Sequence, residues 1–202
     1  MLITGHAKEK KEIIDKMSFN NLILQPVSLK NEKWALVYDS DDYDDANLLF
    51  ELFLMASEKF GLLVEPPQWI ELPKRSSASN FEQYINEDID PKTHRAVLVL
   101  LPKFHYYAQV KRCLDRKGII SQIVLKNNVR KGAKSNNFGL SLASELLKQM
   151  NAKAGGDLYH VTLPKLKYRH TMLIGMDVCH NGPNSIVGFC ATLNESYSKY
   201  YS

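Results

Sequence analysis

The feature that most constrains the fold is an unbroken apolar run, Ala96-Val-Leu-Val-Leu-Leu101. Such a run is typical of a strand that is buried on both faces, as in the centre of a parallel sheet. Parallel strands need crossover connections, which are usually helices. The run therefore predicts an α/β fold in which helices cover both faces of a parallel sheet.

Strand and helix patterns alternate on both sides of this run. Apolar residues predict strands over 34–38, 64–72 and 119–125, the second of them interrupted by two prolines. Apolar residues at helical spacing predict helices over 44–60, 79–89, 106–117 and 137–153. We interpret Lys126–Lys134 as a basic loop. The alternation predicts a doubly wound sheet, which binds ligands outside the carboxyl ends of its strands.

The pattern changes after Pro164. Apolar segments over 172–178 and 186–192 flank the turn-rich His180–Asn184, which predicts a β-hairpin. Two strands cannot form a domain alone, so the hairpin either begins a second domain or packs on the first. Residues 1–30 carry little pattern, and we expect a linker or arm there.

Charge is distributed unevenly along the 202 residues. The formal net charge is +4, but residues 103–170 carry 14 Lys and Arg against 3 Asp and Glu. This excess favours an anion-binding surface, with a solvated basic face that has no dedicated ligand as the alternative. No apolar stretch fits a membrane span or a signal peptide, so we expect an intracellular protein, cytoplasmic or nuclear, with no membrane partner. The three cysteines are expected to be reduced thiols: Cys113, Cys179 and Cys190.

Two pairs of polar residues lie at helical spacing in this basic segment. Tyr107 and Lys111 are four residues apart near the start of the predicted helix that follows the central strand. Backbone N–H groups already favour an anion at such a place. Gln149 and Lys153 have the same spacing at the end of the last predicted helix, and Gln122 opens the intervening strand. Pairs of this kind are also common on exposed helices, so the spacing alone leaves both interpretations open.

The order of these segments resembles the MID signature of the Argonaute/Piwi family. The matching segments are Tyr107-Ala-Gln-Val-Lys-Arg112, Ser121-Gln122 and Asn151-Ala-Lys-Ala-Gly-Gly156. Ile174–His180 followed by Ser185–Phe189 resembles the first strands of the RNase H-like PIWI domain. The resemblance implies a linker or arm over 1–30, a Rossmann-like MID domain over 31–168, and the first strands of a truncated PIWI domain over 169–202.

This resemblance implies binding of the 5′-monophosphate and first nucleotide of a small guide RNA, such as a Piwi-interacting RNA, in gene silencing. The implied phosphate-binding residues are Tyr107, Lys111, Gln122, Gln149 and Lys153, and the Tyr107 ring would also stack on the first base. Gln149 stands where many Argonautes have a second lysine. The resemblance therefore implies that Mg²⁺ binds beside the phosphate with the help of Gln149. In the alternative interpretation, Gln149 only forms hydrogen bonds with phosphate or water.

Neighbouring segments match other parts of the family pattern. The loop that selects the first base aligns with Lys103, Phe104, His105 and Tyr106, and the Piwi resemblance suggests uridine. A basic loop either contacts further phosphates or is solvated. Its basic residues are Lys126, Arg130, Lys131 and Lys134. The implied partners are the guide RNA and the rest of a longer parent chain, and we expect a monomer.

Asp177 matches the first catalytic carboxylate of PIWI, which in RNA-cleaving members binds metal together with later acidic residues. One carboxylate cannot organise a two-metal site, so we expect no cleavage by this segment alone, whereas a full-length parent could be an RNA-guided endonuclease. A nucleotide-binding enzyme is one alternative, but neither GxGxxG nor a GxxxxGK loop is present. A degenerate MID-like module that serves mainly protein contacts is the other.

Overall fold

The computed structural model of the protein describes residues 26–30, 33–133, 136–158 and 171–201. The chain divides into two compact units, one of which is Pro26–Gly156, while the other contains the residues from Asp157 onward. The predicted domain boundary at residue 168 and most of the predicted arm fall outside the described residues, so both stay predictions.

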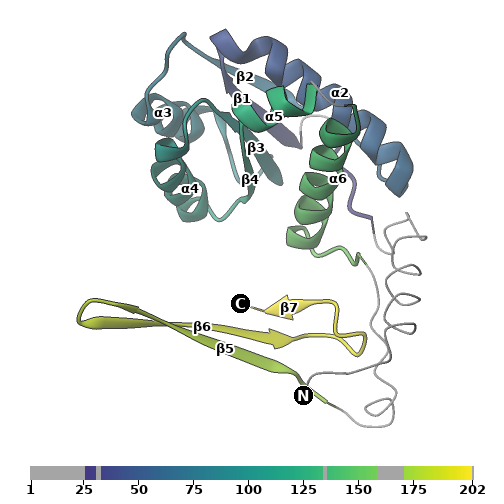
Figure 1. Cartoon of the computed structure of the whole chain (residues 1–202), viewed down its shortest axis with the longest axis vertical. Helices are drawn as coiled ribbons and strands as arrows, with labels where there is room; N and C mark the ends of the chain where they lie inside the picture. Colours follow the sequence, from purple (N-terminus) through teal and green to yellow (C-terminus); the bar gives the residue numbers. More distant parts are fainter. Residues whose placement is uncertain (1–25, 31–32, 134–135, 159–170, 202) are drawn as a thin grey trace. The chain divides into compact units, whose positions relative to one another are not determined.

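The first unit is built on a parallel sheet of four strands (Figure 1). These are β1 (Trp34–Asp39), β2 (Gln68–Leu72), β3 (Ala96–Leu101) and β4 (Ile120–Leu125), in the order β2-β1-β3-β4. β3 lies between β1 and β4, and five of its six residues have no exposed surface. The apolar run is therefore an inner strand of the sheet, and the predicted α/β class is confirmed.

Helices cover both faces of this sheet, as Figure 1 shows. One face carries α3 (Ala78–Asp88) and α4 (Tyr107–Arg116), and the other carries α2 (Tyr43–Phe60), α5 (Lys126–Ala133) and α6 (Asn136–Lys153). Side chains alternate along each strand, so β3 contributes to a core on both faces. On the α3–α4 face this core includes Val97, Phe81, Ile85 and Leu114, all without exposed surface. Burial on two faces explains why the strand is apolar throughout.

Local signals account for where these helices begin and end. Ser77 caps α3 by accepting a hydrogen bond from the backbone N–H of Asn80, whose side chain in turn accepts from the Ser77 N–H. α2 ends at Gly61, which has φ of 65°, a left-handed conformation that favours glycine. The predicted strand over 64–72 is shorter than expected, because β2 begins only after Pro66-Pro67.

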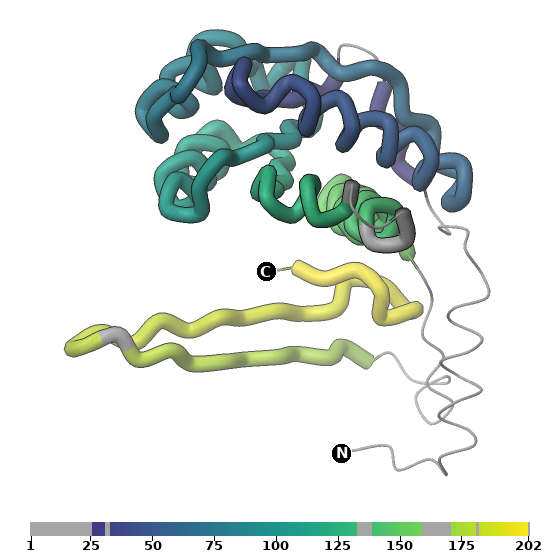
Figure 2. The backbone as a smooth tube through the Cα atoms, turned by 45° about the horizontal axis from the view of Figure 1, so that its top comes forward, coloured from purple at the N-terminus to yellow at the C-terminus, as the bar shows by residue number. Residues whose placement is uncertain are grey.

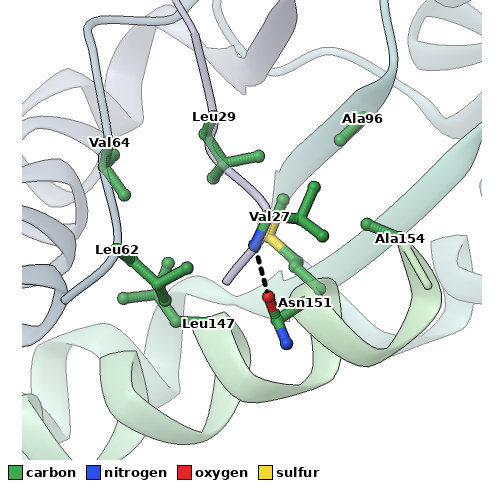
Figure 3. A pocket seen from close by; sticks show the side chains of 9 residues that line it. Val27, Leu29, Leu62, Val64, Ala96, Leu147, Asn151 and Ala154 are labelled. Carbon is green, nitrogen blue, oxygen red and sulfur yellow. Dashed lines mark hydrogen bonds between the residues drawn. The ribbon is translucent and has the colours of Figure 1, made fainter. Parts of the chain in front are cut away.

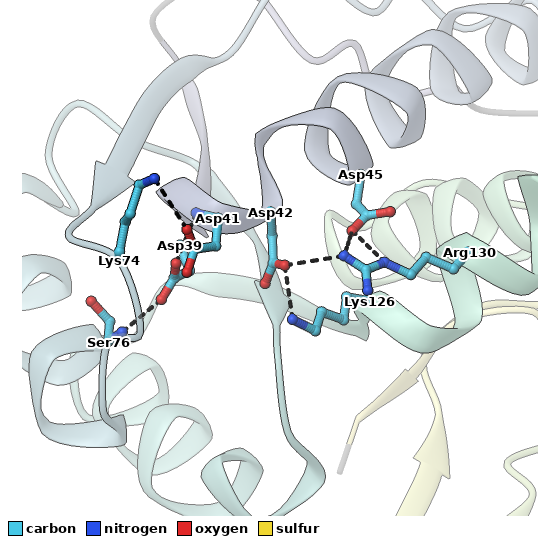
Figure 4. A network of polar contacts seen from close by, with 8 residues as sticks. All are labelled: Asp39, Asp41, Asp42, Asp45, Lys74, Ser76, Lys126 and Arg130. Atoms are coloured by element: carbon cyan, nitrogen blue, oxygen red, sulfur yellow. Dashed lines mark hydrogen bonds and ion pairs between the residues drawn. The ribbon is translucent and has the colours of Figure 1, made fainter.

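The prediction of a loop over Lys126–Lys134 is wrong, because residues 126–133 form α5. Val129 anchors this helix in the core with no exposed surface. Lys126 and Arg130 are four residues apart and both reach carboxylates at the start of α2 (Figure 4). These contacts offset the poor helix propensity of the asparagines and glycine in the segment. Neither contact can be read from the local sequence.

The short segment 26–30 packs beside the amino ends of the strands. Leu29 forms an isolated parallel bridge with Val64, and the Val27 N–H donates to Asn151 Oδ1 at 2.8 Å. Figure 3 shows the small pocket that these residues line with α6 and β3. Among the described residues, Asn151 Nδ2 is buried there without a hydrogen-bond partner.

In the second unit, β5 (Ile174–Asn181) and β6 (Asn184–Thr192) form an antiparallel hairpin, and β7 (Tyr200–Tyr201) pairs with β6 (Figure 2). The predicted hairpin is confirmed, with a tighter turn than expected, in which Gly182 has φ of 60°. The strands are long because each continues into the segment that we predicted as turn. In the described part of the chain, no helix has the length and apolar character that a membrane crossing requires.

Candidate anion-binding site

Two lysine ammonium groups converge on one residue of β4. Lys111 Nζ donates to Ser121 Oγ at 2.7 Å, and Lys153 Nζ donates to the Ser121 carbonyl oxygen at 2.8 Å. Lys153 also donates to Gln122 Oε1 at 2.7 Å. Three of the predicted phosphate-binding residues, Lys111, Gln122 and Lys153, are therefore brought together by the fold.

The position of β4 at the edge of the sheet explains this convergence. α4 lies on one face and α6 on the other, so lysines from the two helices can meet only by reaching a strand that has an open side. Successive side chains of a strand point to opposite faces. The Ser121 hydroxyl accordingly accepts a hydrogen bond from Lys111 of α4, while the Gln122 amide oxygen accepts one from Lys153 of α6. We expected Gln122 to be the first residue of this strand, but it is the third residue of β4.

The electrostatics of the cluster favour an added anion. Burial lowers the pKa of the Lys153 ammonium, and the positive charge of Lys111 lowers it further, whereas Asp115 acts in the opposite direction. Asp115 Oδ1 forms an ion pair with Lys111 Nζ at 2.6 Å. A bound anion would favour the charged form of both lysines, since an opposite charge nearby stabilises an ammonium group.

Each lysine retains donor capacity for a ligand. An ammonium group carries three N–H donors. Among the described residues, Lys153 uses donors toward Ser121 and Gln122, and Lys111 toward Ser121 and Asp115. One N–H of each lysine therefore has no acceptor in this part of the chain. Two fixed ammonium groups with a remaining donor each can bind two oxygens of a phosphate.

Aromatic rings lie one turn before Lys111. Tyr107, the first residue of α4, is 42% exposed and stacks against Phe104, with ring centroids 6.2 Å apart and planes at 15°. Phe104 is 73% exposed. This pair offers a flat apolar surface of the kind on which a base stacks.

The predicted first-base loop is partly a short 3₁₀ helix, Phe104–Tyr106. Its residues differ in environment. Lys103, Phe104 and His105 are exposed, whereas Tyr106 packs against Phe81 of the core with ring centroids 6.3 Å apart. Tyr106 therefore supports the loop from inside.

Gln149 is exposed on α6, one turn before Lys153. Its predicted contribution to Mg²⁺ binding stays a prediction. In the described residues, no group of three or more His, Cys, Asp or Glu side chains is placed to hold a metal ion.

Two of the four residues predicted to contact further phosphates pair with carboxylates, and phosphate contacts by this group stay a prediction. Lys126 Nζ lies 2.9 Å from Asp42 Oδ1, and the Arg130 guanidinium lies 2.7 Å from Asp45 Oδ2 (Figure 4). Both side chains thus already have carboxylate partners. Lys131 is exposed on α5, and Lys134 lies outside the described residues.

Asp177 is exposed on β5, opposite Gly188 of β6, and accepts a hydrogen bond from the Val178 N–H at 3.0 Å.

Sequence reasoning assigned no role to two residues of the lysine cluster, Ser121 and Asp115. Asp115 carried a usable signal, because it lies four residues after Lys111 and so shares its helix face.

Comparison with known proteins decides the family. The Piwi domain family matches residues 96–202, more than half of the chain. The chain belongs to the Argonaute/Piwi family. The Piwi-like protein 1 of Gallus gallus is 29% identical over 85% of this chain and 19% of its own length. Protein argonaute-3 of Drosophila melanogaster is 27% identical over 93% of this chain and 21% of its own length. The chain therefore spans about a fifth of these curated relatives.

Solved structures of the family share the fold. The crystal structure of Drosophila Piwi has a TM-score of 0.77 at 17% identity and covers 92% of this chain and 26% of its own. The MID-PIWI domains of N. crassa QDE-2 AGO have a TM-score of 0.65 at 20% identity, over 89% of this chain and 52% of theirs. Aa-Ago with externally bound siRNA has a TM-score of 0.58 at 18% identity, over 87% of this chain and 26% of its own. The chain thus has the fold of MID-PIWI structures.

Proposed function

We propose that this chain anchors the phosphorylated 5′ end of a small guide RNA. Membership of the Argonaute/Piwi family makes small RNA the expected ligand class. Aa-Ago, which shares the fold, was crystallised with externally bound siRNA, which is a small RNA of the same class. The observation that carries the proposal is the convergence of Lys111 and Lys153 on Ser121, beside the Gln122 amide.

In this proposal the terminal phosphate binds between the two ammonium groups. Each lysine supplies its remaining N–H to a phosphate oxygen, and such charge-assisted hydrogen bonds are the strong ones. A terminal phosphate has three free oxygens, whereas an internal phosphodiester has two. The first base stacks on the exposed rings of Tyr107 and Phe104, which tolerates any base sequence.

We also propose that Mg²⁺ assists this site. The exposed amide oxygen of Gln149 lies one turn before Lys153, and an amide oxygen suits a magnesium ion that keeps most of its other ligands as water and phosphate oxygens. The ion would supply positive charge to the phosphate. Asp177 offers one carboxylate, so we propose that this segment binds RNA, and that cleavage belongs to a longer parent chain.

A titration of the purified chain tests the proposal. A short RNA with a 5′-monophosphate and the same RNA with a 5′-hydroxyl are compared by fluorescence anisotropy at one fixed salt concentration, because salt alone changes RNA affinity strongly. Tighter binding of the phosphorylated RNA is expected, with a preference that decreases in Lys111→Met. Equal binding of both RNAs would contradict a 5′-end anchor and favour a module for protein contacts.

A further inference from the structure

We propose that Asp115 is an internal competitor of the RNA 5′ phosphate, which occupies Lys111 in the free protein and must be displaced on binding. This inference rests on the proposed function of the lysine cluster. Asp115 lies four residues after Lys111 on α4, and its carboxylate oxygen is 2.6 Å from the Lys111 ammonium. The carboxylate thus holds an N–H donor that a phosphate oxygen would otherwise use.

Exposure of the two partners makes exchange feasible. The Asp115 side chain is 58% exposed, while that of Lys111 is 28% exposed. Asp115 can therefore move into water without disturbing the core. Lys111 stays in place, because it also donates to the hydroxyl of Ser121, which is 2% exposed. The structure provides a fixed cation and a removable anion.

The cluster needs such an anion when no RNA is bound. Both ammonium groups contact Ser121, so two positive charges lie close together. Burial lowers the pKa of Lys153 most, the charge of Lys111 lowers it further, and Asp115 acts in the opposite direction. In the free protein the carboxylate reduces the repulsion between the two ammonium groups. In the complex a terminal phosphate, which carries up to two negative charges, supplies that function and leaves the carboxylate redundant. Asp115 therefore stabilises the free fold and weakens RNA binding.

This role predicts effects of opposite sign for one substitution. Asp115→Asn keeps the size of the side chain and removes its charge. The affinity for the 5′-phosphorylated RNA should rise about two- to fivefold, because breaking an exposed ion pair costs free energy that corresponds to a change in affinity of at most about this size. The melting temperature of the RNA-free protein should fall. A residue with only a structural role would lower stability without tightening the binding of RNA.

The experiment measures both quantities in the unaltered chain, in Asp115→Asn, in Lys111→Met, in the double variant and in one control. Asp88→Asn, an exposed acid at the end of α3, controls for the change in net charge. The gain in affinity should be specific to Asp115→Asn and absent from the Lys111→Met background. An unchanged or lower affinity in Asp115→Asn, or an equal gain in Asp88→Asn, would overturn the proposal.

Failure of the proposed function gives a different pattern. In that case the unaltered chain and Asp115→Asn would both bind phosphorylated and hydroxyl RNA equally. A preference for phosphate in the unaltered chain that does not increase in Asp115→Asn refutes the competitor role alone.

Discussion

Replacement of Lys153 by methionine tests the candidate site most directly. Methionine keeps much of the aliphatic stem and removes the ammonium group, which donates to Ser121 O and Gln122 Oε1. In the proposed complex, the third N–H of this ammonium group donates a hydrogen bond to the RNA phosphate. A hydrogen bond to a charged group is worth about 1.5–3 kcal/mol. Since about 1.4 kcal/mol corresponds to a tenfold change in affinity, the phosphorylated RNA should bind about 10- to 150-fold more weakly.

The same substitution should leave the chain folded. The Ser121 carbonyl loses one donor, which costs on the order of 1 kcal/mol. Removal of the repulsion between Lys153 and Lys111, together with the removal of a partly buried charge, offsets part of this cost. The melting temperature should therefore change little, and a loss of binding can be attributed to the site.

The assay is fluorescence anisotropy with 5′-monophosphate and 5′-hydroxyl RNA, for Lys153→Met and for a matched control, Lys148→Met. Lys148 lies on the same helix and forms an ion pair with Glu145 at 2.9 Å. Both variants lose one positive charge. Only Lys153→Met should lose the preference for phosphate, with little change for the hydroxyl RNA. Equal losses for both RNAs, or the same loss in Lys148→Met, would refute the assignment of Lys153.

Three further predictions concern pH, the α5 ion pairs and metal. Because the pKa of Lys153 is lowered, its charge is lost at a lower pH than that of an ordinary lysine, so the preference for phosphorylated RNA should decline as pH rises through this lowered pKa. The folded state disfavours the ammonium form, so the unfavourable contribution of Lys153 to stability is present below that pKa and is relieved above it. Anisotropy across the alkaline range checks this, and a preference that persists at high pH in the unaltered chain would contradict it. Among the described residues, Lys126→Met leaves the buried Asp42 carboxylate with the more distant Arg130 at 3.5 Å as its one cationic partner, and should lower the free energy of unfolding by about 1–3 kcal/mol in urea titrations. Lys131→Met, on the exposed side of α5, should change it by less than about 0.5 kcal/mol, and similar effects of the two variants would argue against the ion pair. If Gln149 helps to hold Mg²⁺, EDTA should weaken binding of the phosphorylated RNA to the unaltered chain. Gln149→Lys should bind this RNA equally with and without EDTA. A variant that is as sensitive to EDTA as the unaltered chain would contradict this role of Gln149.

The architecture of the first unit followed from local signals in the sequence. The apolar run of β3 identified a strand buried on both faces, and the alternation of strands and helices identified a parallel sheet. The end of α2 at Gly61 was also predictable, because a left-handed residue is a local property of the backbone. Such features depend on residues that are close together in the sequence.

α5 could not be predicted in this way. Its sequence, Lys-Asn-Asn-Val-Arg-Lys-Gly-Ala, has few strong helix formers and is typical of a solvated loop. The helix is stabilised by the ion pairs of Lys126 and Arg130 with Asp42 and Asp45, which lie about 85 residues earlier in the chain. Asp42 and Asp45 lie at the start of α2, where carboxylates favour the helix dipole, but their basic partners are given only by the tertiary fold.

By itself, the sequence determined the α/β class, the order of most elements and, through the family motif, which lysines to consider. Only the tertiary structure decided that Lys111 and Lys153 meet, because they reach the edge strand β4 from helices on opposite faces of the sheet. It also decided that Asp115 is part of the same cluster. Hydrophobic periodicity specifies which face of a helix is buried, but the distance between two charges depends on how whole elements pack.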